Sequence, residues 1–366
     1  MSDWETTTLG DLVELQRGHD LPSVTRGVGK VPVIGSFGVT GLHDKAKYPG
    51  PGVAIGRSGA SIGKATYVAD DYWPLNTCLF VSDFKGNDAR WVFRLLDLTD
   101  FESFNSGSAQ PSLNRNFLKS IPVSVPPLAE QRAIAEVLGA LDDKIATNTR
   151  LATKSEALAI ALAAASEPST PLDDLVGVSR TMVDPSLMTV TVVKHYSLPA
   201  FDANHAPESV SPSEIKSGKF LIGRPAVLLS KLNPRFPRAW DIPVVPEDPS
   251  LASTEFVVLH PVGFSTTVLW ALVSQPRFGS ALEGMVAGTS GSHQRVRPAD
   301  MLATPVGDPR SMPEALKKQI TVLGSSATMA RAENLTLVAT RDALLPALMS
   351  GALRVRDAER AVERTV

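Results

Sequence analysis

Residues Gly107 to Lys144 read GSAQPSLNRNFLKSIPVSVPPLAEQRAIAEVLGALDDK, and this segment carries the strongest signal of the fold. A short apolar segment follows its Gly/Ser-rich start, and Pro126-Pro127 then precedes a long run with helical periodicity. Proline is tolerated at the start of a helix but not in its interior. The stretch therefore marks the passage from a globular part into a helix that begins at Leu128.

This helix has a coiled-coil pattern, in which apolar residues alternate at spacings of three and four. The seam opens at Gln131 and continues through Ile134, Leu138, Leu141, Ile145 and Asn148. A second helix follows the same rule through Leu316, Ile320, Leu323, Asn334, Leu337 and Leu344. One asparagine in each seam is expected to fix the register of the pair. The first helix would be roughly 57 Å long if it reached Ala165, although both helices could instead pack only on their own domains.

The chain repeats itself about once, which is the signature of a duplicated unit. The sequence LGDLV from Leu9 is followed by Arg17, and LDDLV from Leu172 is followed by Arg180. LKSIPV from Leu118 corresponds to MLATPV from Met301, and the tripeptide VLG comes at a matching place after each. Three landmarks in one order favour duplication over a chance likeness of two α/β domains.

The globular parts contain short apolar runs between Gly, Pro and Asn/Asp clusters, which predict strands. Four such runs are Val53–Ile55, Leu79–Val81, Val227–Leu229 and Phe256–Leu259. We therefore expect the α+β class, with two α/β globular domains and two long helices. The expected order is a first domain (1–127), a helix (128–167), a second domain (168–311), a helix (312–356) and a tail (357–366).

Composition excludes several classes of protein. Cys78 is the only cysteine, so a disulfide within the chain and cysteine-based zinc sites are excluded. No apolar run approaches the roughly 20 residues of a membrane-spanning helix, and the N-terminus lacks a secretory signal, so we expect a cytoplasmic protein. The net charge of -2 argues against a general nucleic-acid binder. The six histidines suggest neither a catalytic triad nor a metal centre.

The segment from Gly107 to Lys144 resembles the junction between a target-recognition domain and a spacer helix in the specificity subunits of type I restriction-modification systems. VAIGRSGASIGK from Val53 and AVLLSKLNP from Ala226 resemble parts of the family's first and second recognition domains. The second half departs from the pattern, because Ser292-His293-Gln294-Arg295 replaces a QP-like motif and the PPL-EQ run is missing after Met312.

The resemblance implies a non-catalytic reader of DNA. Two recognition domains would be separated by two antiparallel coiled-coil helices in a pseudo-two-fold internal repeat, and each domain would address one half of a split target. Half-sites about one helical turn apart suit such a repeat. Because the two domains differ in sequence, the target would be asymmetric. The implied partners are double-stranded DNA, two methyltransferase subunits and restriction-translocase subunits. Those subunits would hold the S-adenosylmethionine, ATP and Mg²⁺. The resemblance implies no cofactor and no metal in this chain.

Candidate DNA contacts are side chains that can donate to phosphates or base edges, grouped in loops. In the first domain they are Arg57, Ser58, Lys64, Asn76, Gln110, Asn114 and Arg115. In the second domain they are Lys231, Asn233, Arg235, Arg238, His293, Gln294, Arg295 and Arg297. Each cluster could instead be structural, for example by capping a helix.

Two enzyme hypotheses and one scaffold hypothesis are alternatives to this interpretation. The segment Gly59–Lys64 resembles a phosphate-binding loop, but Ser58 and Ala65 replace the first glycine and the hydroxyl residue that such a loop needs. Asn233-Pro234-Arg235-Phe236 resembles the NPPF motif of adenine methyltransferases, yet no glycine-rich cofactor loop lies nearby. A coiled-coil adaptor without a DNA role is the scaffold alternative.

Overall fold

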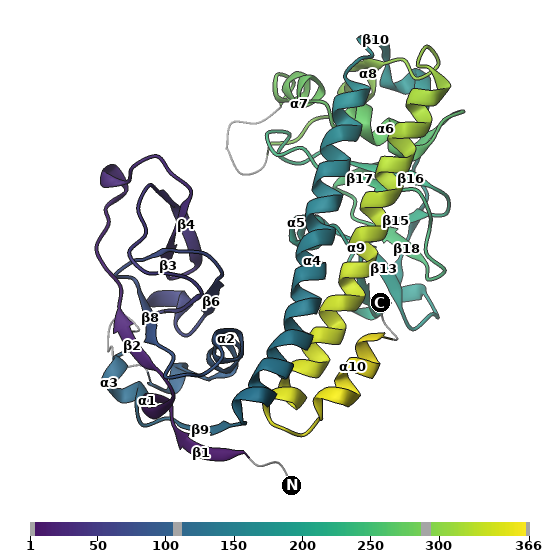
Figure 1. Ribbon diagram of the computed structural model, residues 1–366. Coiled ribbons are helices and arrows are strands. Elements are labelled where there is room, and N and C mark those ends of the chain that lie inside the picture. The colour runs from purple at the N-terminus through teal and green to yellow at the C-terminus, as the bar shows by residue number, and fades with distance from the viewer. Residues whose placement is uncertain (1–3, 105–111, 287–293, 364–366) are drawn as a thin grey trace. The chain divides into compact units, whose positions relative to one another are not determined.

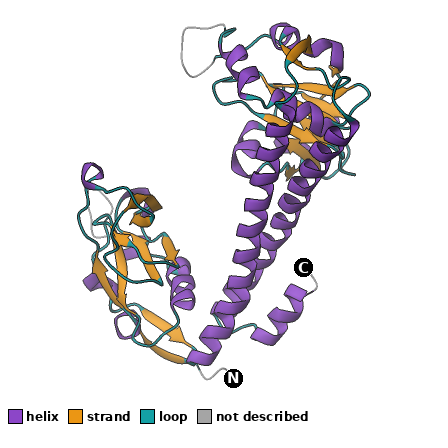
Figure 2. Cartoon of the chain, turned by 45° about the horizontal axis from the view of Figure 1, so that its top comes forward, coloured by secondary structure: helices purple, strands orange, loops and turns teal. Residues whose placement is uncertain are grey.

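A computed structural model describes residues 4–104, 112–286 and 294–363 (Figure 1). The chain forms two compact units: residues 1–145 with 336–366, and residues 146–335. Each unit combines one globular part with a portion of both long helices. Figure 2 distinguishes the strands, in orange, from the helices, in purple.

The first unit is built on a four-stranded sheet in the order β2-β8-β5-β6, with all neighbours antiparallel. Its strands are β2 (Glu14–Arg17), β8 (Cys78–Asp83), β5 (Gly52–Gly56) and β6 (Ala65–Val68). A second sheet contains β4 (Gly38–His43), β3 (Val31–Gly35) and β7 (Trp73–Pro74), and β1 (Glu5–Thr8) pairs with β9 (Pro122–Val125). The helices are α1 (Leu9–Leu12), α2 (Ala89–Leu98) and α3 (Arg115–Leu118), with 3-10 turns at Ser23–Thr25, Gly59–Ser61 and Glu102–Phe104.

The second unit repeats the strand order of the four-stranded sheet and has a larger second sheet. Its four-stranded antiparallel sheet, in the order β11-β19-β16-β17, contains β11 (Val176–Ser179), β19 (Phe256–Pro261), β16 (Ala226–Ser230) and β17 (Ala239–Ile242). A five-stranded sheet contains β12 (Met182–Val183), β15 (Lys219–Ile222), β18 (Ser250–Ala252), β13 (Val193–Tyr196) and β14 (Glu208–Val210), while β10 (Pro168–Pro171) pairs with β20 (Pro305–Gly307). The helices are α5 (Leu198–Asn204), α6 (Thr266–Val273), α7 (Pro276–Glu283) and α8 (Pro298–Ala303), with 3-10 turns at Leu172–Leu175, Pro185–Leu187 and Pro212–Glu214.

The two units therefore confirm the duplicated unit and the α+β class. In each of them the strand at the start of the globular part pairs with the strand that ends it, β1 with β9 and β10 with β20. The four strands predicted from apolar runs lie within β5, β8, β16 and β19. These runs are apolar throughout because both faces of each strand are covered. Val53 and Ile55 of β5 join one core cluster, and Ala54 between them joins another.

Two long helices complete the units, α4 (Leu128–Ala163) and α9 (Glu314–Met349). Each starts after a proline whose carbonyl accepts the first helical hydrogen bonds: Pro127 accepts from the amides of residues 130 and 131, and Pro313 accepts from those of 316 and 317. Gly351 follows α9 with a φ of +71°, which is the left-handed conformation of a helix C-cap. The chain then forms α10 (Val355–Glu363). The helix predicted over 312–356 is thus shorter, and the predicted tail is largely helical.

Within each unit a portion of α4 packs beside a portion of α9 in the antiparallel sense (Figure 1). In the first unit, residues of both helices share one apolar cluster with α2, among them Ile134, Leu138, Leu141, Leu337 and Leu344, while Ile145 is partly buried against it. In the second unit Ile320 is fully buried, and Leu316 and Leu323 pack at the edge of the same cluster. The helices therefore pack on each other and on their globular parts at once.

The polar seam residues behave differently from one another. Asn148 Nδ2 donates to Glu333 Oε2 at 2.8 Å, and Asn334 Nδ2 donates to Thr149 Oγ1 at 3.0 Å, so both asparagines bond across the helix pair. Gln131 is buried, but it bonds to the globular part, because its Oε1 accepts from the Asp88 amide at 3.0 Å. That the asparagines set the register remains a prediction.

Candidate nucleic-acid interface

In the first unit, three segments that are distant in sequence meet where β5 leaves its sheet. The Arg57 amide donates to the Thr77 carbonyl at 3.1 Å, and the Arg57 carbonyl accepts from the Leu113 amide at 2.8 Å. Ser58 and Ser112 face each other in an isolated antiparallel bridge. We call this arrangement the strand-end corner of the first unit, with residues 57–58, 77 and 112–115.

A shallow groove of about 450 Å³ opens at this corner. It is lined by Gln16, Arg17, Arg57, Leu79, Ser112, Leu113, Asn114 and Arg115. Three of these residues are arginines, and none of the described lining residues carries a carboxylate. The Arg57 guanidinium is held by the Asn76 carbonyl at 3.3 Å, while Arg17 and Arg115 are exposed. The groove therefore concentrates positive charge in a chain whose net charge is negative.

Two of the predicted contacts also hold the corner together. Asn114 Oδ1 accepts from the Asn116 amide at 3.0 Å and so caps α3. The Asn76 side-chain amide donates to the Asp20 carboxylate. Both side chains thus have structural roles, and Asn114 keeps its amide donors available as well.

Lys64 is exposed at the end of the loop from β5 to β6. The Gly56 amide donates to the Lys64 carbonyl at 3.0 Å, which makes the loop the tip of an antiparallel hairpin. A phosphate-binding loop needs a helix whose N-terminal amides and dipole face the phosphate. Here strand β6 follows Lys64 directly, so the nucleotide-binding alternative lacks its geometry.

The second unit forms an equivalent corner where β16 leaves its sheet. The Lys231 amide donates to the Glu255 carbonyl at 2.9 Å, and the Lys231 carbonyl accepts from the Val296 amide at 3.0 Å. Leu232 and Arg295 form an isolated antiparallel bridge. We call this arrangement the strand-end corner of the second unit, with residues 231–233, 255 and 294–297.

The hydrogen bonds define which positions of the two corners correspond. Lys231 occupies the place of Arg57, Arg295 that of Ser112, and Arg297 that of Asn114. Asn233, with a φ of +49°, takes the place of Gly59, with a φ of +70°. The structure therefore brings described members of the two predicted clusters of each domain together, at the same topological position in both units.

Three arginines at or beside the second corner are paired with carboxylates. Arg295 pairs with Glu255 at 2.8 Å, Arg238 pairs with Asp202 at 2.6 Å, and Arg297 pairs with Asp300 at 2.8 Å. The hydrogen bond from Arg295 lowers the pKa of Glu255, and the one from Arg238 lowers the pKa of Asp202. Each pair is nearly neutral, so it attracts phosphate less than an uncompensated arginine would.

The turn that follows Lys231 presents the remaining predicted residues. The Phe236 amide donates to the Asn233 carbonyl at 2.8 Å, which closes a tight turn. Arg235 is exposed at this turn, and the Asn233 amide donates to the carbonyl of Gln294 at 2.8 Å. Gln110 and His293 lie outside the described residues.

Sequence reasoning missed one arginine of the groove. Arg17 pairs with Leu79 at the end of β2, beside Arg57. The signal was present, because Arg17 and Arg180 stand at the same place after the repeated opening motif. Arg180 directly follows β11, the counterpart of β2, and is exposed.

Within the described ranges, no cluster of three or more His, Cys, Asp or Glu side chains could hold a metal ion. No helix in this part of the chain is both long and apolar enough to cross a membrane.

The family model for the type I restriction modification DNA specificity domain matches residues 1–156. This segment is therefore similar to that family, in agreement with the resemblance expected from the sequence. The type I restriction enzyme EcoprrI specificity subunit of Escherichia coli is 26% identical over 140 residues, or 37% of this chain. The match spans only 35% of that relative's length.

A solved structure shares the fold of nearly the whole chain. The S subunit of a type I restriction-modification system from M. genitalium gives a TM-score of 0.65 at 14% identity, over 95% of this chain and 96% of that chain. At this identity the likeness concerns the fold alone. It extends the similarity beyond residue 156 into the second unit.

Proposed function

We propose that this chain is the DNA-recognition subunit of a type I restriction-modification complex. Residues 1–127 and 168–311 act as two target-recognition domains, and the helical segments 128–167 and 312–356 act as spacers. The recurrence of one strand-end corner in both globular parts, with different side chains at matching positions, supports this proposal most directly. Different side chains imply different half-sites, and hence an asymmetric bipartite target.

The charge distribution supports unequal contributions of the two domains to the electrostatic attraction of DNA. Arg17, Arg57 and Arg115 line a groove without acidic lining residues, whereas Arg238 and Arg295 are already paired with carboxylates. Phosphate contacts dominate DNA affinity, so the first domain contributes more of the electrostatic attraction. An arginine held by a carboxylate is nevertheless well oriented for reading a base edge.

The chain has no catalytic role in this proposal and binds two methyltransferase subunits, through which restriction-translocase subunits are recruited. S-adenosylmethionine, ATP and Mg²⁺ belong to those partners, which direct adenine methylation or cleavage. Because its net charge is -2, the isolated chain binds DNA weakly, and most of the nonspecific attraction comes from the partners.

Mapping of methylated adenines in host DNA tests the proposal. Replacing residues 1–127 with the corresponding domain of another specificity subunit should change one half of the methylated motif and leave the other half unchanged. If the protein is a scaffold without a DNA role, the motif stays the same after the exchange. That result would exclude the proposed function.

Variants of the groove give a finer test with the assembled complex. Arg57→Ala and Arg115→Ala should each weaken target binding about five- to tenfold, which corresponds to the loss of roughly 1–1.4 kcal/mol. Lys85→Ala is the matched control, because it also removes one positive charge. Lys85 lies just after β8, at the opposite end of this strand from Leu79, which lines the groove. Equal binding by all three variants would argue against the groove.

A further inference from the structure

A separate cavity of about 400 Å³ lies within the second unit. Strand β17, helices α5 and α6, and the second unit's portions of α4 and α9 all contribute to its lining. No residue of the corner segments 231–233 or 294–297 lines it. Its volume lies in the range of small-molecule sites, and far above the ~30 Å³ that one water occupies.

Aromatic rings form one wall of this cavity. Trp240 lies edge-on to Tyr196 at 4.8 Å between ring centroids and to Phe201 at 5.5 Å, and all three rings line the space. Trp270 contributes from α6, with its Nε1 donating to the Ala239 carbonyl at 3.0 Å. Such walls favour an apolar or planar body, and aromatic faces attract cations.

The charged groups around the cavity leave one carboxylate under-compensated. Glu156 pairs with Arg331 (Oε2 to Nη2, 2.6 Å), so these two largely cancel. Burial, reinforced by the positive charge of Arg331, lowers the pKa of His205 and so favours its neutral form. Asp241 Oδ2 accepts from the Thr267 hydroxyl at 2.6 Å. Its Oδ1 is shielded from solvent and has no hydrogen-bond partner among the described residues, although the residue keeps some exposed surface. The hydroxyls of Thr266 and Thr267 lower the pKa of Asp241, but burial raises it by more.

A buried carboxylate without a full set of partners is costly, and an opposite charge placed beside it is favourable. The nearby cations do not neutralise Asp241, because Arg331 pairs with Glu156 and Arg238 pairs with Asp202. An anionic ligand would instead face the Asp241 charge across a poorly solvated space. The chemistry of the lining thus selects for positive charge on an apolar body.

We propose that this cavity binds a small organic cation, with its ammonium or amidinium group beside Asp241 and its apolar body against Trp240 and Trp270. The site differs from the DNA-reading corners in its residues and its chemistry. A ligand there contacts β17 and α9 together, so it stabilises the packing of the second recognition domain on its helix.

Isothermal titration of the full-length chain with three probes of matched shape tests this site. The probes are phenethylammonium, 2-phenylethanol and phenylacetate, which share a phenyl body and differ in charge. The cation should bind at least tenfold more tightly than the alcohol, and phenylacetate should bind most weakly. If the cation and the alcohol bind equally, or if no probe binds at millimolar concentration, the proposal is wrong.

Two variants locate the binding. Asp241→Asn keeps the shape and removes the charge, so it should weaken phenethylammonium binding at least tenfold and leave 2-phenylethanol unchanged. Ala332→Phe places a ring at the cavity from α9 and should reduce binding of both probes. Ala339→Phe is its control, on an exposed position of the same helix that does not line the cavity. Unchanged cation binding by Asp241→Asn would overturn the assignment.

Discussion

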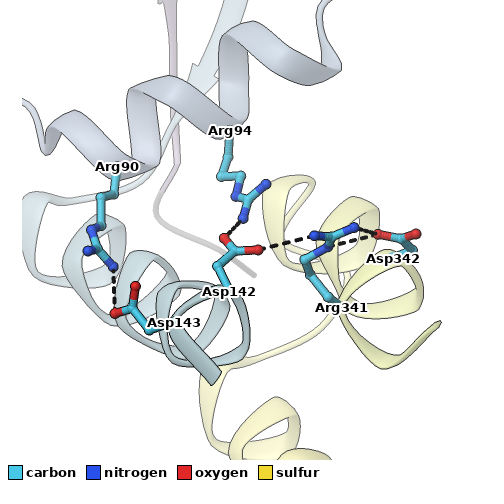
Figure 3. A network of polar contacts seen from close by, with 6 residues as sticks. All are labelled: Arg90, Arg94, Asp142, Asp143, Arg341 and Asp342. Carbon is cyan, nitrogen blue, oxygen red and sulfur yellow. Dashed lines mark hydrogen bonds and ion pairs between the residues drawn. The ribbon is translucent and has the colours of Figure 1, made fainter. Parts of the chain in front are cut away.

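Asp142 of α4 forms ion pairs with two other helices of the first unit. Removing its charge tests how much these buried contacts stabilise that unit. Its carboxylate pairs with Arg94 of α2 and with Arg341 of α9, the latter at 3.2 Å (Figure 3). The Arg94 side chain is only 9% exposed. Burial lowers the pKa of Arg94, and the positive charge of Arg341 lowers it further. Asp142→Asn therefore leaves a buried guanidinium facing a like charge.

The expected loss follows from burial. Breaking a fully buried ion pair costs about 3–5 kcal/mol. The Asp142 side chain is 35% exposed, so solvent screening reduces this figure, and we expect about 2 kcal/mol. With a typical urea slope, the unfolding midpoint then falls by about 1 M. Urea titration followed by circular dichroism measures the shift, and hydrogen exchange of the α2 amides localises it.

Asp143→Asn is the matched control on the neighbouring residue. Asp143 pairs with Arg90 at 3.5 Å, but their side chains are 70% and 41% exposed. Exposed pairs contribute below about 1 kcal/mol. The double variant Arg94→Met, Asp142→Leu should recover most of the stability, because no buried charge is then left unpaired. If Asp142→Asn destabilises no more than Asp143→Asn, the reasoning about burial is refuted.

Three further predictions concern backbone, charge and pH. Gly63→Ala should cost more stability than Gly59→Ala in thermal melts, since both have positive φ but only Gly63 would bring a Cβ to 2.8 Å from Phe101. Arg17→Ala should weaken DNA binding by the complex and lower the slope of log K against log salt by about 1. Burial raises the pKa of Asp241 from 3.8 to about 6. Between these two pKa values the folded state holds a proton that the unfolded state has lost. About 3 kcal/mol of stability that is present below pH 4 is therefore lost as the pH rises through 6. Asp241→Asn should abolish this loss in urea titrations.

The helix starts were accessible from the sequence because their signals are local. Pro127 was expected to precede the first helix, and α4 begins at Leu128. The end of α9 and the existence of α10 were missed. Gly351 was a visible stop signal, but the apolar side of α10 becomes recognisable only when the surface that it covers is known.

For the two corners, too, the sequence predicts the individual segments but not their meeting in the folded chain. The segments around Arg57 and Arg115 were identified separately as candidate DNA contacts, because each combines donors with turn residues. Their meeting depends on the Ser58–Ser112 bridge, which joins strands that no local pattern connects. In the sequence, Arg17 stands out only as a landmark of the repeat, although it lines the same groove.

The duplication, the long helices and the core strands are predictable from the sequence, because periodicity and proline positions are local signals. Which cations remain available for a partner depends on the folded chain. Arg238 is neutralised by a carboxylate 36 residues away and Arg295 by one 40 residues away, while Arg17, Arg57 and Arg115 gather without one among the lining residues. Ion pairing depends on distance in space, and folding sets that distance.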